Sequence, residues 1–133
     1  MNRTEIVEKY ILPFMFWVIA FFAPIYEFIA IIGFMIFADT ITGVLAANKM
    51  NELIQLRKLF RSVVKFISYG LGIIIAQIVS CYFLQNFPAV QLMAGFIAFI
   101  EVKSIDENIC KITGHSIFNV ILEKLKHGNK TNS

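Results

Sequence analysis

Long apolar runs separated by short charged segments constrain this chain more than any other feature. Every Lys and Arg lies in one of three clusters, so residues 10–48 and 66–102 contain no basic side chain. A helix needs about 20 mainly apolar residues to cross a bilayer, and these gaps are long enough for crossings. Basic clusters between apolar runs are typical of a membrane protein whose charged segments lie in the cytoplasm.

Composition supports the same class of protein. The chain is 58% hydrophobic and 16% charged, whereas soluble domains are about 45–50% apolar and about 25% charged. These values argue against a soluble enzyme and against a disordered chain. The net charge of +3 does not indicate a nucleic-acid partner, because the basic residues follow the membrane pattern instead. Membrane lipid is therefore the expected partner.

We expect an all-α integral membrane protein that forms a single membrane domain over residues 1–133. It has about four transmembrane helices, with three as the alternative. The expected crossings are residues 10–26, 28–47, 63–84 and 88–105. Amphipathic helices are expected on the cytoplasmic side at residues 49–62 and 116–127, where apolar and polar residues fall on different faces. With four crossings, both termini and the basic loop lie in the cytoplasm.

The first crossing depends on Pro24. Proline is poorly tolerated inside a helix, so residues 23–27 are the candidate turn of a helical hairpin. The competing interpretation is one kinked helix over residues 10–47, which is longer than a bilayer requires.

The loop after the second crossing carries a basic cluster, which we expect to associate with the anionic surface of the membrane. The alternative is a solvated connector. The cluster comprises Lys49, Arg57, Lys58, Arg61 and Lys65.

Asp39 is the most informative single position. It lies about 13 Å from the cytoplasmic end of the second crossing at about 1.5 Å per residue. A carboxylate at that depth costs about 2.5–3.5 kcal/mol, so it must face protein or water or be protonated. It is either a pore-facing or helix-contact group or a structural acid bonded nearby. Thr42 follows it, and Gly43 and Ala47 form one small-residue step that permits close helix approach.

The third crossing carries a ridge of small residues with a spacing of four, which places them on one helix face. Its members are Ser68, Gly72, Ala76 and Ser80. The ridge can pack within one subunit or between subunits. The adjacent Gln77 can bond a partner helix or face a wet lumen.

The fourth helix places Glu101, Ser104 and Asn108 on one face by their three- and four-residue spacing. Lys65 and Lys103 are candidate counter-ions for the acids at the membrane interface. An interfacial ion-pair network without a transport role is the alternative interpretation.

The sequence contains no residue pattern typical of a catalytic or metal-binding site. No nucleophile–base–orienter set and no Gly-rich phosphate loop occurs, and His115 and His127 are isolated. Cys81 and Cys110 do not make a disulfide framework. We therefore expect no enzyme activity, no metal and no cofactor.

Three segments in this order resemble a known family. They are Asp39-Thr40-Ile41-Thr42-Gly43, then Arg57-Lys58-Leu59-Phe60-Arg61, then Glu101-Val102-Lys103-Ser104-Ile105-Asp106-Glu107-Asn108 with Gly114 six residues on. Together they resemble the toxin-secretion/phage-lysis family of phage holins, small membrane proteins encoded by phages and prophages. The sequence departs from the family pattern after Gly114, where His115 and Ser116 stand in place of prolines.

The resemblance implies a lysis protein of the bacterial cytoplasmic membrane. Holins self-associate as homo-oligomers, open lesions that collapse the membrane potential, and so release or activate an endolysin. The alternative function is a non-lytic membrane scaffold or a subunit of a small transport or secretion complex.

Overall fold

The structure, a computed structural model, describes residues 2–52 and 56–128, and within them every regular element is a helix. The expectation of an all-α fold is thus confirmed. The elements are α1 (Arg3–Ile6), the π-helical η1 (Val7–Ile11), α2 (Leu12–Phe22), α3 (Tyr26–Lys49), α4 (Leu56–Tyr82), α5 (Ala89–Thr113) and α6 (Ile117–Gly128).

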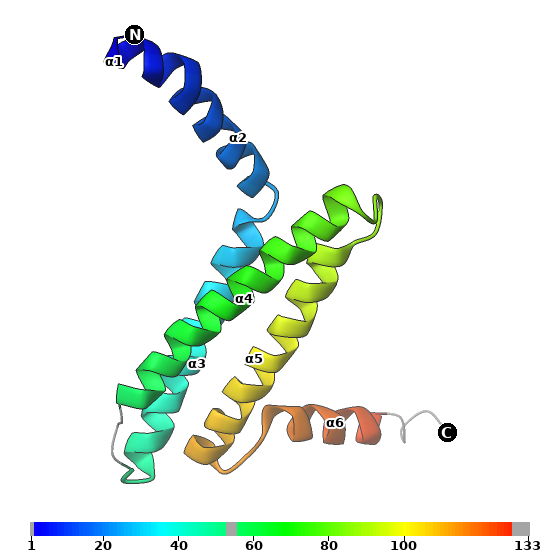
Figure 1. The fold of residues 1–133 in the computed structure, drawn as a ribbon. Coiled ribbons are helices and arrows are strands. Elements are labelled where there is room, and N and C mark those ends of the chain that lie inside the picture. The colour runs from blue at the N-terminus through cyan, green and yellow to red at the C-terminus, as the bar shows by residue number, and fades with distance from the viewer. Residues whose placement is uncertain (1, 53–55, 129–133) are drawn as a thin grey trace.

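The long helices α3, α4 and α5 pack side by side as an up-and-down bundle (Figure 1). A core of small and β-branched residues lies between them, which lets the helices approach closely. It includes Ile32, Ile36, Ile73, Ala76, Ala94 and Ile97, each at most 8% exposed. The glycines contribute too, since a Cβ at Gly33 would lie 3.1 Å from the Phe66 ring.

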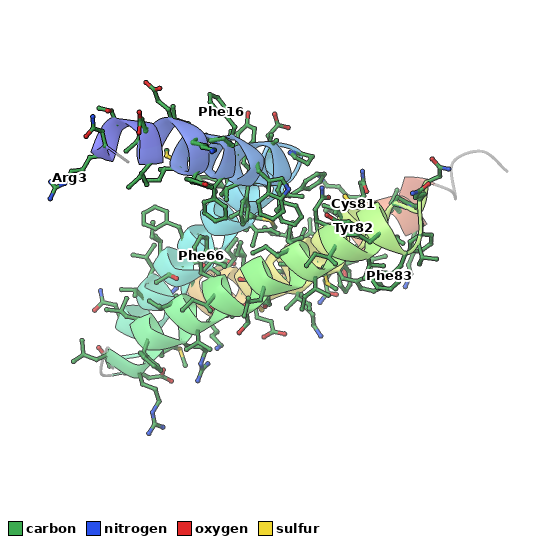
Figure 2. All side chains as sticks on the ribbon, turned by 45° about the horizontal axis from the view of Figure 1, so that its top comes forward. Arg3, Phe16, Phe66, Cys81, Tyr82 and Phe83 are labelled. Atoms are coloured by element: carbon green, nitrogen blue, oxygen red, sulfur yellow. The ribbon has the colours of Figure 1, made fainter. Side chains whose placement is uncertain are left out.

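The outer surface of the bundle carries many large apolar side chains. Phe34 on α3 and Phe96 on α5 are 70% and 69% exposed. Figure 2 shows Tyr82 and Phe83 projecting outward at the end of α4, and Phe16 on α2. By length and composition, α3 and α4 are two helices able to cross a membrane. Together with the exposed apolar surface, these two helices point to a membrane protein, whereas the expected count of four crossings stays a prediction.

The N-terminal helices lie apart from the bundle. A turn occurs at residues 23–25, where Pro24 cannot donate a helical hydrogen bond, and Ile25 is fully buried at the start of α3. From this turn α2 leads away from the bundle (Figure 1), and α1, η1 and α2 contain no buried residue. The chain therefore forms neither one continuous helix over residues 10–47 nor a hairpin in which α2 packs along α3.

The loop region differs from the expected surface helix at residues 49–62. The helix α3 continues to Lys49, and α4 begins at Leu56 and runs unbroken into the third expected crossing. Residues 56–62 thus belong to a long bundle helix. Their apolar residues Leu56, Leu59 and Phe60 are exposed, whereas Lys58 and Ser62 lie on the partly buried side that faces the other helices. Residues 53–55 of the expected helix lie outside the described residues.

At the same end of the bundle, α5 ends and α6 turns sharply away (Figure 1). Gly114 caps α5 in the left-handed conformation at φ 79°, which glycine adopts without a Cβ clash. Asp106 of α5 then fixes the start of α6, because its carboxylate accepts hydrogen bonds from the Ser116 hydroxyl at 2.6 Å and from the Ile117 backbone N–H at 2.7 Å. The helix α6 matches the amphipathic helix expected at residues 116–127.

Candidate functional site

A polar network joins the three bundle helices around Lys65. The Lys65 Nζ lies 2.8 Å from Asp39 Oδ2 and 3.1 Å from the Glu101 carboxylate. Asp39 belongs to α3, Lys65 to α4 and Glu101 to α5, so one ammonium group connects all three helices. We call these three residues, together with their hydrogen-bonding partners, the Lys65 network. Its members are Asp39, Thr42, Lys65, Tyr69, Glu101, Ser104 and Asn108.

The α5 side of the Lys65 network holds the other oxygen of Asp39. The Ser104 hydroxyl donates to Asp39 Oδ1 at 2.7 Å, and the Asn108 Nδ2 donates to the same oxygen at 2.9 Å. Asn108 also donates to the Thr42 hydroxyl at 3.2 Å. A Cβ at Gly43 would lie 3.5 Å from Asn108 Nδ2, which is an ordinary van der Waals contact. The backbone of α3 at Gly43 therefore lies close to the Asn108 amide of α5.

Glu101 is the most buried charged group of the Lys65 network, with 0% exposure. Besides Lys65, its carboxylate accepts a hydrogen bond from the Tyr69 hydroxyl at 2.9 Å. Asp39 and Lys65 have side chains that are 13% and 22% exposed. Within the described part of the chain, no buried side-chain nitrogen or oxygen lacks a partner, as stability inside a bilayer requires.

Further polar contacts extend from the Lys65 network toward the end of the bundle where α3 ends and α4 begins. We call this end the loop end. The Thr40 hydroxyl donates to the Ile36 carbonyl oxygen and lies 2.7 Å from the Ser62 hydroxyl. Lys49 at the end of α3 donates to the Ile112 carbonyl oxygen of α5. The polar ties therefore gather in the half of the bundle that adjoins the basic cluster.

A cavity of about 380 Å³ opens between α3, α4 and α5 beside these ties. Asp39, Lys65, Ser104 and Asn108 of the Lys65 network line it. Members of the basic cluster line it as well, namely Lys58 and Arg61. The cavity is thus polar although the bundle around it is apolar.

The small-residue ridge lies partly within the bundle. Ala76 is 5% exposed, and a Cβ at Gly72 would lie 3.7 Å from the Met93 sulfur of α5. Ser80 donates to the Phe87 carbonyl oxygen in the α4–α5 turn. Gln77 is buried, at 9% exposure, while Ser68 is exposed. The middle of the ridge therefore contacts α5 of the same subunit.

The structure brings Asp39, Glu101, Ser104 and Asn108 together, and it selects Lys65 over Lys103 as the cation that contacts the acids. Lys103 is exposed on the outer side of α5. Thr42 contacts Asn108, and Ala47 is buried at 2% exposure.

Sequence analysis missed Tyr69, Ser62 and Asp106 as contributors. Tyr69 follows Lys65 by four residues, and this spacing places the two on one helix face. Asp106 gave no periodic signal, because its partners lie beyond a turn that only the fold defines. Among the described residues, no group of three His, Cys, Asp or Glu side chains could hold a metal ion.

Comparison with protein families gives a match over most of the chain. A model of the bacteriophage holin family matches residues 16–129, which include α3 to α6 and every residue of the Lys65 network. No curated protein and no solved structure matches the chain.

Proposed function

The chain belongs to the bacteriophage holin family, and from this premise we propose that it acts as a non-enzymatic, homo-oligomeric holin. It accumulates in the bacterial cytoplasmic membrane and forms lesions that depolarise it. An endolysin is then released or activated, and the host cell lyses.

The Lys65 network is the observation that carries this proposal. Charged groups inside a bilayer are stable only when paired or hydrated. In the isolated subunit, Lys65, Asp39 and Glu101 satisfy one another across three helices. When subunits gather and the helices separate, the same groups can line water instead of lipid. The network therefore favours two states, a closed bundle and a hydrated assembly.

The proposed topology has four crossings with both termini in the cytoplasm. The loop end of the bundle lies on the cytoplasmic side, because the basic cluster adjoins it. The α4–α5 turn then faces outward. Residues 10–26, which include α2, form the remaining crossing, surrounded by lipid, and the polar residues before them lie in the cytoplasm. A three-crossing form, with α2 lying along the outer surface, is the alternative.

Controlled expression in bacteria with a membrane-potential dye tests the lytic function. We expect a timed depolarisation, and lysis only when an endolysin is co-expressed. Asp39→Ala shifts the time of depolarisation because it removes the acceptor that joins α3 to Lys65, Ser104 and Asn108. Glu27→Ala is the matched control, an acid at the exposed start of the same helix. An intact potential at high expression contradicts the holin function and favours the non-lytic scaffold.

A cysteine-labelling experiment tests the topology. Arg3→Cys is placed in a chain with Cys81→Ser and Cys110→Ser, and intact cells are treated with a membrane-impermeant maleimide. Four crossings predict protection of position 3 until the cells are permeabilised. Labelling in intact cells instead establishes an odd number of crossings. A second variant, Glu27→Cys, serves as the control, because position 27 is external in both topologies.

A further inference from the structure

The polar cavity at the loop end is lined by charged side chains outside the Lys65 network. Asp39 and Lys65 are paired with each other, and Lys58 lies 3.5 Å from Glu52. Arg61 from α4 and Lys111 from α5 also line the cavity. Within residues 2–52 and 56–128, neither of these two cations has a carboxylate at ion-pair distance. The helices α4 and α5 thus each contribute to the cavity one basic side chain without such an ion pair.

The helix α6 indicates where this cavity lies relative to the membrane surface. It is amphipathic and runs across the bundle direction (Figure 1), as a helix does that lies in the plane of the head groups. Its start is fixed by Asp106, which directly precedes Glu107 and lies two residues before Asn108, both cavity-lining residues. The cavity therefore opens at the level of the lipid head groups.

We propose that this cavity is a binding site for the phosphate of an anionic phospholipid. Arg61 supplies a planar pair of donors that matches two phosphate oxygens, and Lys111 supplies a point charge from the facing helix. Basic pockets between membrane helices bind lipid head groups in this way, and a volume of about 380 Å³ falls within the range of small-ligand sites. The site goes beyond lesion formation, and it differs from general surface attraction because it lies between helices.

Substitution of Glu107 can distinguish phosphate binding in this cavity from a general effect on protein stability. It lines the same cavity, and a carboxylate close to an anionic phosphate opposes its binding. Glu107→Gln should therefore tighten binding severalfold. A substitution that only loosened the protein would weaken binding instead.

Native mass spectrometry of the full chain in mild detergent tests the proposal. The protein is titrated with phosphatidylglycerol, with phosphatidylcholine and with inorganic phosphate. We expect one tightly bound phosphatidylglycerol per subunit. The double variant Arg61→Gln with Lys111→Gln weakens it on the order of thirtyfold, because each basic residue near an anionic head group contributes about a fivefold factor.

The matched control is Arg57→Gln with Lys103→Gln, which removes the same two residue types from the same two helices outside the cavity. Equal losses in both double variants, or equal binding of phosphatidylcholine, overturn the site. Saturation by inorganic phosphate that excludes the lipid overturns the lipid assignment. Binding is read without lysis, so a chain that binds the lipid but never depolarises cells contradicts the proposed function alone.

Discussion

Replacing Lys65 with methionine removes the cation that contacts both Asp39 and Glu101. Removing one partner of a buried ion pair costs about 3–5 kcal/mol, because the other charge stays buried and unpaired. Lys65 is 22% exposed while Glu101 is fully buried, so we expect a loss near the lower end, about 3 kcal/mol. Asp39→Asn should cost much less, about 1 kcal/mol. Its amide oxygen still accepts from Ser104 and Asn108. Its amide nitrogen cannot accept from Lys65 as Oδ2 does, but Lys65 keeps Glu101.

The measurement is unfolding of the purified protein in mixed micelles, with SDS as the denaturant and far-UV circular dichroism as the readout. A triple variant, Lys65→Met with Asp39→Asn and Glu101→Gln, removes all three charges while nearly keeping the side-chain shapes. It should recover most of the stability, since an ion pair replaced as a whole is often close to neutral. Equal losses for Lys65→Met and Asp39→Asn, or no recovery in the triple variant, would refute the electrostatic reasoning.

Two further predictions concern packing and the position of α6. Gly72→Leu should destabilise the bundle by about 1–3 kcal/mol by overpacking, because its Cβ starts 3.7 Å from the Met93 sulfur. Gly70→Leu on the same helix has open space and should leave the unfolding midpoint unchanged or raised; equal effects would exclude the contact. Asp106→Ala should cost about 0.5–2 kcal/mol as a lost helix cap and speed amide hydrogen exchange at the start of α6. Glu107→Ala is its control, and unchanged exchange in both would show that the cap does not hold α6.

The sequence predicts the helical class and several helix ends because those follow from local chemistry. Pro24 marks a turn, Pro88 precedes α5, and Gly114 ends it. The direction of α2 after the turn could not be predicted, because a run that is apolar all round has no preferred face. The continuity of residues 56–62 with α4 was also missed, since an amphipathic segment is compatible with both a surface helix and a bundle helix.

The candidate site was also predictable only in part. The three- and four-residue spacing of Glu101, Ser104 and Asn108 predicts a shared face, and the structure places that face against Asp39 or Lys65. The pairing itself depends on how far α5 slides along α3, which side-chain packing decides and local spacing does not. Lys65 and Lys103 were equal candidates for this reason, and only the rotation of α4 and α5 about their axes separates them.

The ion pairs and hydrogen bonds between the helices lie in one half of the bundle, and this has a mechanical consequence. Apolar contacts gain little from association in lipid, where the surroundings are as apolar as the contact. The half of the bundle near the α4–α5 turn is held mainly by such contacts, among them Ile32, Ile73 and Ala94. The opposite half is cross-linked by ion pairs and hydrogen bonds. The two ends of the bundle therefore differ in stiffness, and lateral parting of the helices should begin at the turn end and reach Lys65 last.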